Sequence, residues 1–317
     1  MRRERRRTQA PSVSVCLGTF RRNEKLRLLL DDLVAQQRLP DEVVVVDNTA
    51  TGDARHVVER RVLDGAPFPI RYAIQPERNI ALTRNRSVAL ASGEWIAFVD
   101  DDERASPDWL ARLLDAAENY QADGVLGPVL PVLPAQAPGW IGRGRFYDWP
   151  RMPSGTPVPR NRMRFGNVLL RGSLLRSHSE PFDPSCGLTG GEDGDLLARL
   201  AQEGARIAWC DEATVQEPVE DSRLSLRWLM LRALRGGQDF SRHTLAGRYG
   251  AATRVRVALL LLRSFVQMLA AGGLAAMSLP FGRHRAAHWA IKVAANFGKL
   301  SLFWGWRYDE YARRAAA

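Results

Sequence analysis

The stretch Trp95-Ile96-Ala97-Phe98-Val99-Asp100-Asp101-Asp102 decides the fold prediction, because five apolar residues are followed at once by three acids. A continuous apolar run of this length is typical of a strand that is buried on both faces of a sheet. Three adjacent carboxylates at its end repel one another unless a cation lies among them. Oxygen ligands of this kind suit Mg²⁺ or Mn²⁺, which can also bind a diphosphate. A solvated acidic turn is the alternative.

Strand and helix signals alternate along the first 130 residues of the chain. Leu26, Leu29, Leu30 and Leu33 have the spacing of one helical face, whereas 42–46 is an almost purely β-branched run. Repeated strand–helix units with continuous apolar strands imply an α/β fold, with a mainly parallel sheet covered by helices on both faces. The predicted strands are 13–17, 42–46, 70–74, 95–99 and 124–130, and the predicted helices are 24–37, 53–63, 80–91 and 107–119.

The second half of the chain is less regular. Residues 131–165 are rich in Pro, Gly and Arg and lack periodicity, which predicts a long functional loop or a partly ordered insertion. A strand at 165–170, a helix at 196–202 and a short strand at 207–209 are predicted to follow. From residue 222 onward the pattern predicts a basic helical extension.

Charge is unevenly distributed along the 317 residues, whose net charge is +10. Residues 222–317 contain 16 Lys and Arg against 3 acids, and residues 1–7 are also basic. Basic ends around a mildly acidic middle indicate anionic partners, either membrane headgroups or nucleic acid. The three cysteines, Cys16, Cys186 and Cys210, lack the paired spacing of a disulfide framework or a zinc site. This agrees with a reducing compartment.

The segment 255–281 is mostly apolar but is interrupted by Arg256 and Arg263. The uncharged part, 264–282, falls at the lower edge of the length that spans a membrane. Three interpretations therefore stay open: an interfacial or re-entrant segment, a soluble helical hairpin, or a true membrane span. Basic residues interleaved with tryptophans around this segment suit a membrane interface, and they would also suit ordinary packing.

Three predicted strands end in polar groups: Thr19, Asp47 and the Asp triplet. In open parallel sheets ligands bind beyond these carboxyl ends. Together with a later Gly-Gly-Glu-Asp, the chain resembles family-2 glycosyltransferases of the GT-A fold, and more narrowly the glucosyltransferases of succinoglycan-type exopolysaccharide assembly. The resemblance covers about residues 12–220, and its motifs are Val15-Cys16-Leu17-Gly18-Thr19-Phe20-Arg21-Arg22-Asn23, Val45-Val46-Asp47-Asn48, Ile80-Ala81-Leu82-Thr83-Arg84-Asn85, Gly93 to Glu103, and Gly190-Gly191-Glu192-Asp193-Gly194-Asp195.

The resemblance implies a role for each polar strand end. Thr19 and Asp47 are expected to contact the uridine of a UDP-sugar, although Asp47 alone would read as a turn former. Arg84 is expected near the donor diphosphate, although an isolated Arg on a helix usually faces solvent.

The same resemblance implies a different role for each acid of the triplet. Asp102 is implied as the direct ligand of Mg²⁺ or Mn²⁺, and Asp100 as a contact of the ribose or of the metal and its waters. Asp101 lies between them in the donor site, and in an extended stretch its side chain can point elsewhere.

The Glu-Asp pair supplies the expected catalytic base. By resemblance Asp193 removes the proton of the acceptor hydroxyl, and Glu192 is the substitute candidate. The alternative is that both acids complement a helix N-terminus, where negative charge is favourable by about 0.3–1 kcal/mol. Gly190 and Gly191 would permit a close backbone approach to a sugar.

Other candidate sites are weaker. His284 and His288 have a helical metal-ligand spacing, but no carboxylate is near them in the sequence. Arg232 and Arg235 are expected either to reach a donor or acceptor diphosphate or, as the blander alternative, to form a solvated basic face.

These observations predict an inverting, metal-dependent glycosyltransferase that transfers a sugar, glucose by resemblance, from a UDP-sugar to a lipid-diphosphate-linked glycan. The expected domains are a basic disordered N-terminus (1–11), a GT-A domain (12–221) and a membrane-associating helical tail (222–317). The expected location is the cytoplasmic face of the inner membrane, as a peripheral or monotopic protein. The rivals are a nucleic-acid-binding protein, disfavoured because no nucleic-acid motif appears, and a non-catalytic glycan-binding relative.

Overall fold

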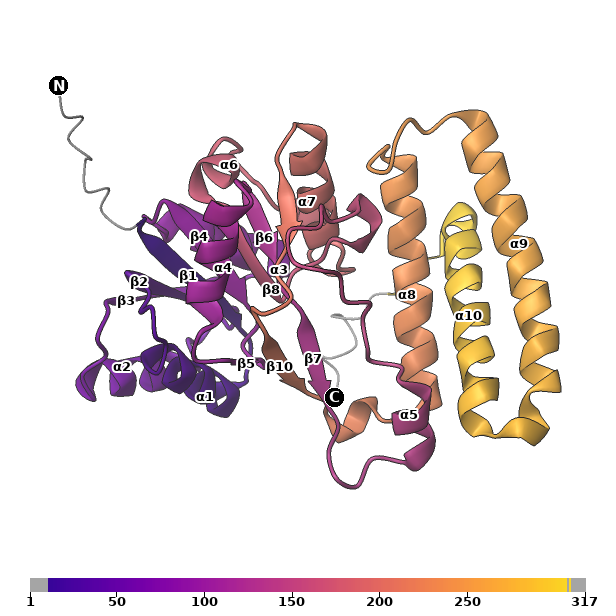
Figure 1. Cartoon of the computed structure of the whole chain (residues 1–317), viewed down its shortest axis with the longest axis horizontal. Helices are drawn as coiled ribbons and strands as arrows, with labels where there is room; N and C mark the ends of the chain where they lie inside the picture. Colours follow the sequence, from indigo (N-terminus) through magenta and orange to yellow (C-terminus); the bar gives the residue numbers. More distant parts are fainter. Residues whose placement is uncertain (1–10, 307, 309–317) are drawn as a thin grey trace.

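The computed structural model describes residues 11–306 and residue 308. The prediction of a disordered N-terminus at 1–11 therefore lies outside the described residues, apart from Pro11. The described chain forms an α/β domain with a bundle of three long helices beside it (Figure 1).

The centre of the α/β domain is a seven-stranded sheet in the order β3-β2-β1-β4-β8-β6-β9. Strands β3, β2, β1 and β4 are parallel, as are β6 and β9, whereas β8 runs antiparallel to β4 and β6. The prediction of a mainly parallel sheet is confirmed. The strands are β1 (Val13–Thr19), β2 (Glu42–Asp47), β3 (Ile70–Ile74), β4 (Trp95–Val99), β6 (Gly124–Leu126), β8 (Asn167–Arg171) and β9 (Ile207–Trp209).

Helices cover both faces of this sheet because its strands are apolar on both sides. In β1, Val15 and Leu17 belong to one buried cluster, whereas Cys16 between them belongs to the other. The first cluster includes α1 (Asn23–Val34), α2 (Arg55–Leu63) and α4 (Trp109–Asn119). The second includes α3 (Ile80–Leu90), α6 (Gly172–Arg176) and α7 (Glu192–Gln202).

The segment 131–165 is more ordered than its sequence indicates. The predicted strand 124–130 divides into β6 and β7 (Val129–Val132), and β7 joins β10 (Val215–Pro218) and β5 (Arg104–Ala105) in a second, three-stranded sheet. The short helices α5 (Gly139–Gly144) and η1 (Arg160–Arg162) follow. The strands of the second sheet were not predicted because their pairing partners are distant in sequence. Two further short helices, η2 (Pro184–Cys186) and η3 (Asp221–Arg223), were also not predicted.

The tail consists of α8 (Leu226–Leu245), α9 (Arg254–Met277) and α10 (Arg283–Ser301), joined by η4 (Leu279–Phe281) and followed by η5 (Leu302–Trp304). Helix α10 lies between the other two (Figure 1). A buried cluster joins the tail to the α/β domain, since Trp140 of α5, Val219 after β10, Leu229 of α8 and Ala287 of α10 pack together.

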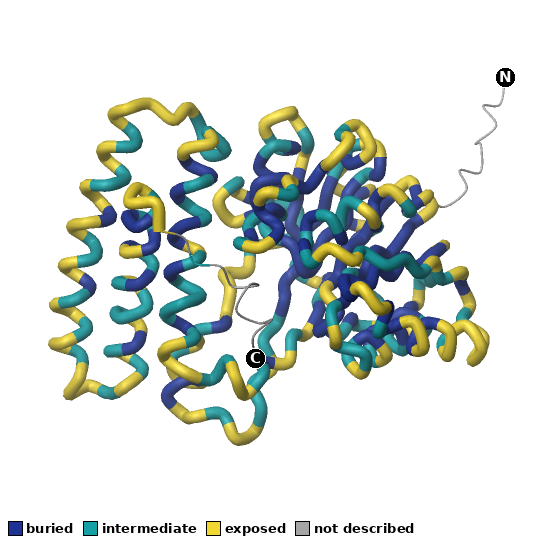
Figure 2. The backbone as a smooth tube through the Cα atoms, turned by 180° about the vertical axis from the view of Figure 1, so that it is seen from behind, coloured by how far each residue is buried: buried dark blue, intermediate teal, exposed yellow. Residues whose placement is uncertain are grey.

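Helix α9 is continuous and forms the outer edge of the bundle, where much of its length is exposed (Figure 2). By length and composition it is the one helix in the described ranges that could cross a membrane. Between Val255 and Leu269 five of its exposed apolar side chains are spaced alternately four and three residues apart, and Met277 follows eight residues later on the same face, so these side chains form one stripe. We call this the α9 stripe: Val255, Leu259, Leu262, Val266, Leu269 and Met277.

Candidate functional site

The carboxyl ends of β1, β2 and β4 meet at one edge of the large sheet. Thr19 and Asp47 are direct neighbours in the parallel register of β1 and β2. The hydroxyl of Thr19 donates to Oδ2 of Asp101, at 2.8 Å, just beyond the end of β4. The structure thus brings the polar ends of three predicted strands together, as expected of an open parallel sheet.

Arginines neutralise the acid triplet. Arg22 lies 2.8 Å from Oδ1 of Asp101 and 3.0 Å from Oδ2 of Asp102, and Arg223 lies 3.3 Å from that same oxygen of Asp102. Asp101 and Asp102 are buried, whereas the Asp100 side chain is half exposed. Although the Asp100 side chain is half exposed, the protein atoms around its carboxyl desolvate it, and this desolvation, together with the charges of Asp102 and Asp101, raises its pKa to about 6 against the lowering effect of Arg84.

Arg84 connects the triplet with the Glu-Asp pair. Its Nη1 lies 2.6 Å from Oε1 of Glu192, and its Nη2 lies 3.5 Å from Oδ1 of Asp100. The guanidinium also lies over the rings of Phe165 and Phe182, with 4.9 Å and 5.7 Å to the ring centroids. The Arg84 side chain therefore faces these acids, and its contact with a donor diphosphate stays a prediction.

Glu192 and Asp193 form the first turn of α7, which begins four residues earlier than its apolar pattern predicts. Burial raises the pKa of Glu192 to about 7, and its Oε2 is buried without a hydrogen-bond partner. Asp193 differs because Arg84 and the backbone N–H groups of Phe165 and Gly194 lower the pKa of its carboxyl despite burial. Phe165 N donates to Oδ2 of Asp193 at 3.0 Å. One acid is therefore ionised near neutrality while its neighbour titrates there.

The glycines before this pair have the left-handed backbone that favours glycine, with φ of 82° at Gly190 and 86° at Gly191. Helix α8 holds them from the other side. Arg242 donates to Thr189 Oγ1 at 2.8 Å and to the carbonyl of Gly190, and His243 Nε2 lies 3.0 Å from the carbonyl of Gly191. The tail therefore helps to shape the acidic loop.

Both carboxylate oxygens of Asp47 already accept hydrogen bonds from within the protein, mainly from the loop that follows it. Oδ1 accepts from the backbone N–H and the hydroxyl of Thr49, and Oδ2 accepts from Ala54 N and the Tyr72 hydroxyl. Asp47 is fully buried. In this structure its carboxylate shapes the loop 47–54 at the strand end.

Two arginines of the tail, and Arg164 from the segment 131–165, border the site. Arg232 and Arg235 are half-buried. Arg232 lies over the Trp228 ring, at 5.3 Å from its centroid, and Arg235 approaches Gly190. Arg164 lies over the Trp149 ring at 3.8 Å, and its Nη2 is buried without a hydrogen-bond partner. Burial and Arg232 lower the pKa of Arg164 to about 10.

Four further site residues were missed by the sequence analysis: Arg22, Glu103, Arg164 and Arg223. Glu103 is buried behind the triplet, where Oε2 accepts from Asp100 N at 3.1 Å. Burial raises its pKa well above the usual value. Arg22 lies inside a stretch that carries the resemblance, so an arginine three residues after a polar strand end was an available signal. No sequence signal marked Arg223 or Arg164, because only the tertiary fold brings them to the acids.

The acids fit a hard divalent cation in part. Asp100 and Asp102 offer only oxygen, and the carboxylates of Asp102 and Asp101 add to the desolvation that raises the pKa of Asp100. In the described ranges no three His, Cys, Asp or Glu side chains are arranged to hold a metal ion. Mg²⁺ commonly binds through one or two carboxylates and takes its other ligands from water and substrate phosphates. The donor set therefore suits an ion that arrives with a diphosphate.

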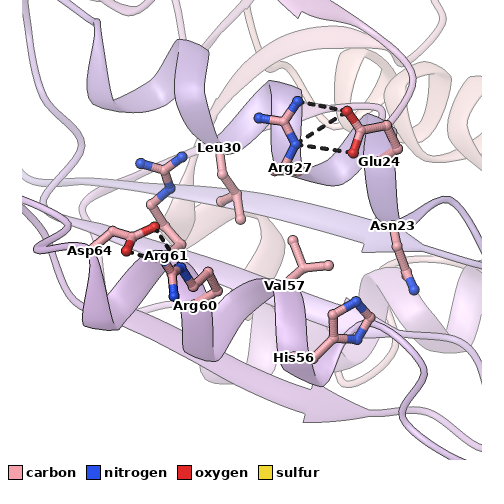
Figure 3. Close-up of a pocket in the computed structure, with 9 residues that line it drawn as sticks. All are labelled: Asn23, Glu24, Arg27, Leu30, His56, Val57, Arg60, Arg61 and Asp64. Carbon is pink, nitrogen blue, oxygen red and sulfur yellow. Dashed lines mark hydrogen bonds and ion pairs between the residues drawn. The ribbon is translucent and has the colours of Figure 1, made fainter.

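A separate depression of about 320 Å³ lies between α1 and α2 (Figure 3). The charged groups that line it are satisfied locally, since Arg27 pairs with Glu24 and Arg60 with Asp64. None of the acids of the triplet or of the Glu-Asp pair lines it.

Comparisons with known proteins agree with this geometry. Residues 14–168 match the family described as glycosyl transferase family 2. The chain is 36% identical over 253 residues to the succinoglycan biosynthesis protein ExoM of Rhizobium meliloti strain 1021, covering 78% of this chain and 79% of that protein.

Two solved structures share the fold. The mannosyltransferase PcManGT of Pyrobaculum calidifontis, in complex with GDP-Man and Mn²⁺, has a TM-score of 0.66 at 20% identity and covers 92% of this chain and 88% of its own. TarS residues 1–349 of S. aureus, in complex with UDP, has a TM-score of 0.53 at 17% identity and covers 94% and 93%. The predicted GT-A fold is confirmed, and the chain belongs to glycosyltransferase family 2.

Proposed function

We propose that this glycosyltransferase transfers a sugar, glucose by its resemblance, from a UDP-sugar to a glycan on a lipid diphosphate, with inversion at the anomeric carbon. The observation that carries the proposal is the position of Arg84 between Asp100 and Glu192. Through these two contacts Arg84 joins the sheet edge to the acidic loop in a single site. Nucleotides bind at such an edge in open α/β sheets, and the acidic loop can supply a base.

Asp193 is the proposed base. The acceptor hydroxyl oxygen attacks the anomeric carbon from the face opposite the diphosphate, and the bond from that carbon to the diphosphate oxygen breaks. The hydroxyl proton passes to the Asp193 carboxylate, and the nucleoside diphosphate leaves with the electron pair. A base must be ionised before the reaction, and the lowered pKa of Asp193 supports that role over Glu192. Glu192 instead positions Arg84.

Asp102, with Asp100 beside it, would hold Mg²⁺ or Mn²⁺. When bound, the ion supplies positive charge that stabilises the departing diphosphate. Arg84 lies where it can add to that charge, and Arg22 and Arg223 both contact Oδ2 of Asp102. Thr19 and the loop built by Asp47 are the proposed boundary of the uridine position, and Asp101 is proposed to act in the same donor site through Thr19.

Arg164, Arg232 and Arg235 are proposed to contact a diphosphate from the tail side. Arg164 and Arg232 lie in a partly buried region, where nearby like charges create a need for an anion. The lowered pKa values of Arg164 and Arg232, caused by burial and by neighbouring arginines, agree with this need. The domain division proposed here, 12–221 and 222–317, thus leaves a tail that contributes to the site.

The tail is also proposed to hold the protein on the cytoplasmic face of the inner membrane. Its α9 stripe is exposed, and Arg256 and Arg263 lie one heptad apart along one flank of that stripe. Apolar burial combined with basic flanks favours a helix that lies in the interface.

The other two interpretations of 255–281 fit less well. A re-entrant segment would interrupt α9, which is continuous from Arg254 to Met277. A span would take α10 into the hydrocarbon with α9, since the two pack along each other. Lys292 and Lys299 of α10 would then be costly. A soluble hairpin would leave the exposed stripe without an explanation.

The decisive experiment incubates the purified protein with membranes and a panel of UDP-sugars, and analyses the lipid-linked products by mass spectrometry. One UDP-sugar should add a single residue to a lipid-linked glycan. Salt-sensitive retention on DNA without UDP binding would favour the nucleic-acid rival. Binding of a glycan without turnover of any donor would favour a non-catalytic relative.

A further inference from the structure

A second cavity, which none of the acids of the site lines, lies where the tail meets α5. It has a volume of about 380 Å³ and opens between the C-terminal end of α5, the end of α9 and the first turns of α10. Its polar lining comes from Arg143, Ser278, His284, Arg285 and His288, with Trp289 as its aromatic wall. The two histidines, which the sequence offered as a metal pair, therefore face a cavity that they share with arginines.

The lining consists of hydrogen-bond donors without acidic partners. The sequence has no Asp or Glu between Asp239 and Asp309, and none of the residues that line the cavity is acidic. In the described part of the chain, neither Arg143 nor Arg285 takes part in an ion pair. Nδ1 of His284 is buried without a hydrogen-bond partner. Arg143, Arg285 and His288 are exposed, so the cavity presents an open cationic surface, and an anion bound there would pair with these groups together.

The rim of the cavity is strongly apolar on one side. The turn between α9 and α10 exposes Met277, Leu279 and Phe281 to 70%, 69% and 65%. Ser278, which lines the cavity, lies inside this turn, so the cationic wall and the apolar surface are continuous. The turn also continues the α9 stripe, which ends at Met277. A free small anion would use the cationic wall alone, whereas a phospholipid presents a phosphate next to acyl chains.

We propose that this cavity binds the phosphate of an anionic phospholipid headgroup while the apolar turn at 277–281 inserts beside its acyl chains. The proposal rests on the proposed membrane docking, which it deepens: the α9 stripe supplies apolar attachment, and the cavity supplies selectivity for anionic lipid. It also fixes one end of α9 at the headgroup level. The site is separate from the acids that handle the donor, so donor chemistry does not depend on it.

The test uses the full chain and vesicles of phosphatidylcholine alone or mixed with phosphatidylglycerol. Arg143→Gln with Arg285→Gln removes two cations from the cavity. The matched control, Arg86→Gln with Arg162→Gln, removes two exposed cations elsewhere. Any arginine near an anionic surface contributes about fivefold to binding, and the control pair measures that general effect. The cavity variant should lose at least about tenfold more affinity for phosphatidylglycerol vesicles than the control, with binding to phosphatidylcholine unchanged.

A second measurement separates a lipid site from a site for any phosphate. Titration calorimetry with short-chain phosphatidylglycerol below its micelle concentration should show binding to the wild type and none to the cavity variant. Equal affinity for inorganic phosphate would overturn the lipid assignment, and so would equal losses in the cavity and control variants. UDP binding by the cavity variant should match the wild type, which shows that it is folded. If donor turnover fails while lipid selectivity persists, the proposed reaction is wrong and the cavity assignment stands.

Discussion

The guanidinium of Arg84 lies 2.6 Å from the carboxylate of Glu192, although the two residues are 108 positions apart in the chain. The other end of the same guanidinium faces Asp100 at 3.5 Å. One side chain on α3 therefore couples the donor end of the site to the first turn of α7. Because the Phe165 ring lies against the guanidinium, this position is set by packing as well as by charge.

The coupling predicts a pH dependence through Glu192, whose pKa is about 7. As the pH falls through that value, Glu192 becomes neutral and its charged contact with Arg84 is lost. The kcat/KM of the wild type should therefore fall on the acid side with an inflection near pH 7. Glu192→Gln should retain measurable transfer, at or below the wild-type rate at low pH, and show no inflection there. A Glu192→Gln variant with wild-type pH dependence would contradict this assignment.

The same shift predicts the direction of a stability change. The folded-state pKa of Glu192 lies above its usual value of 4.5, so the folded state binds more protons than the unfolded state. The free energy of unfolding of the wild type should then decrease as the pH rises between these two values. Chemical denaturation across that range should show a smaller decrease for Glu192→Gln.

Asp102→Asn should abolish turnover and sharply weaken UDP binding in the presence of Mg²⁺ or Mn²⁺. The reason is the proposed coupling of metal and diphosphate at this carboxylate. Calorimetric titration with UDP, with and without EDTA, measures it. Asp108→Asn is the control, since it removes an acid nearby in the sequence that pairs with Arg112 on α4. Unchanged UDP binding in Asp102→Asn, insensitive to EDTA, would mean that the arginines alone bind the diphosphate.

Asp193→Asn keeps the shape of the side chain and removes the proton acceptor. Donor binding should survive, and transfer should fall by about 10²-fold or more. Asp195→Asn is the matched control in the same turn, because Asp195 pairs with Arg199 and Arg248 rather than with the site. Its main expected effect is on stability. If Asp193→Asn transfers sugar at the wild-type rate, the base is Glu192 or another group, and a loss of folding would support a purely structural role at the helix N-terminus.

The sequence was sufficient for the strands and helices whose partners are near in the chain. Apolar runs such as 42–46 and 95–99 predict strands buried on both faces, and both are present. The short strands β5, β7 and β10 were not predictable, because two to four residues carry no periodicity and their partners lie far away. Helix α7 begins at Glu192 because acidic residues are favourable at a helix N-terminus. The apolar pattern that predicts the helix starts only at Leu196.

The candidate site divides in the same way. Thr19, Arg84 and the acid triplet were found because each follows a recognisable strand or motif, and the fold brings them together. Arg223 and Arg164 were missed because their neighbours are set by tertiary packing of the tail. For Asp47 the sequence could not distinguish a ligand contact from a loop contact, since both place an acid at a strand end.

Thr49→Val tests the role of Asp47 without changing Asp47. The Thr49 hydroxyl donates to Asp47 at 2.8 Å and accepts from Gly52 N and Asp53 N. The variant should lose about 1–3 kcal/mol of stability in urea unfolding and weaken UDP binding, because the loop beside the nucleotide loosens. Thr51→Val, at an exposed position of the same loop, should stay within about 0.5 kcal/mol of the wild type. If Asp47→Asn abolishes UDP binding while Thr49→Val leaves it intact, Asp47 contacts the nucleotide directly.

The last prediction concerns the α9 stripe. Leu262→Gln with Val266→Gln replaces two of its exposed side chains, which are 61% and 55% accessible. Fully burying such a side chain is worth about 1.5–3 kcal/mol, so even half that gain predicts at least a tenfold loss of vesicle binding. The control is Val62→Gln with Leu63→Gln on α2, at 52% and 81% exposure, and should bind like the wild type.

Extraction conditions distinguish the kinds of attachment. High salt should release only part of the wild type from membranes, because the apolar contribution persists when charges are screened. Alkaline carbonate should release the remainder of an interfacial helix, whereas complete resistance would indicate a span. Full release by salt would mean a purely electrostatic contact. If the wild type ignores anionic vesicles at low salt and instead forms a dimer that the stripe variant disrupts, the stripe is covered by a second copy of the chain.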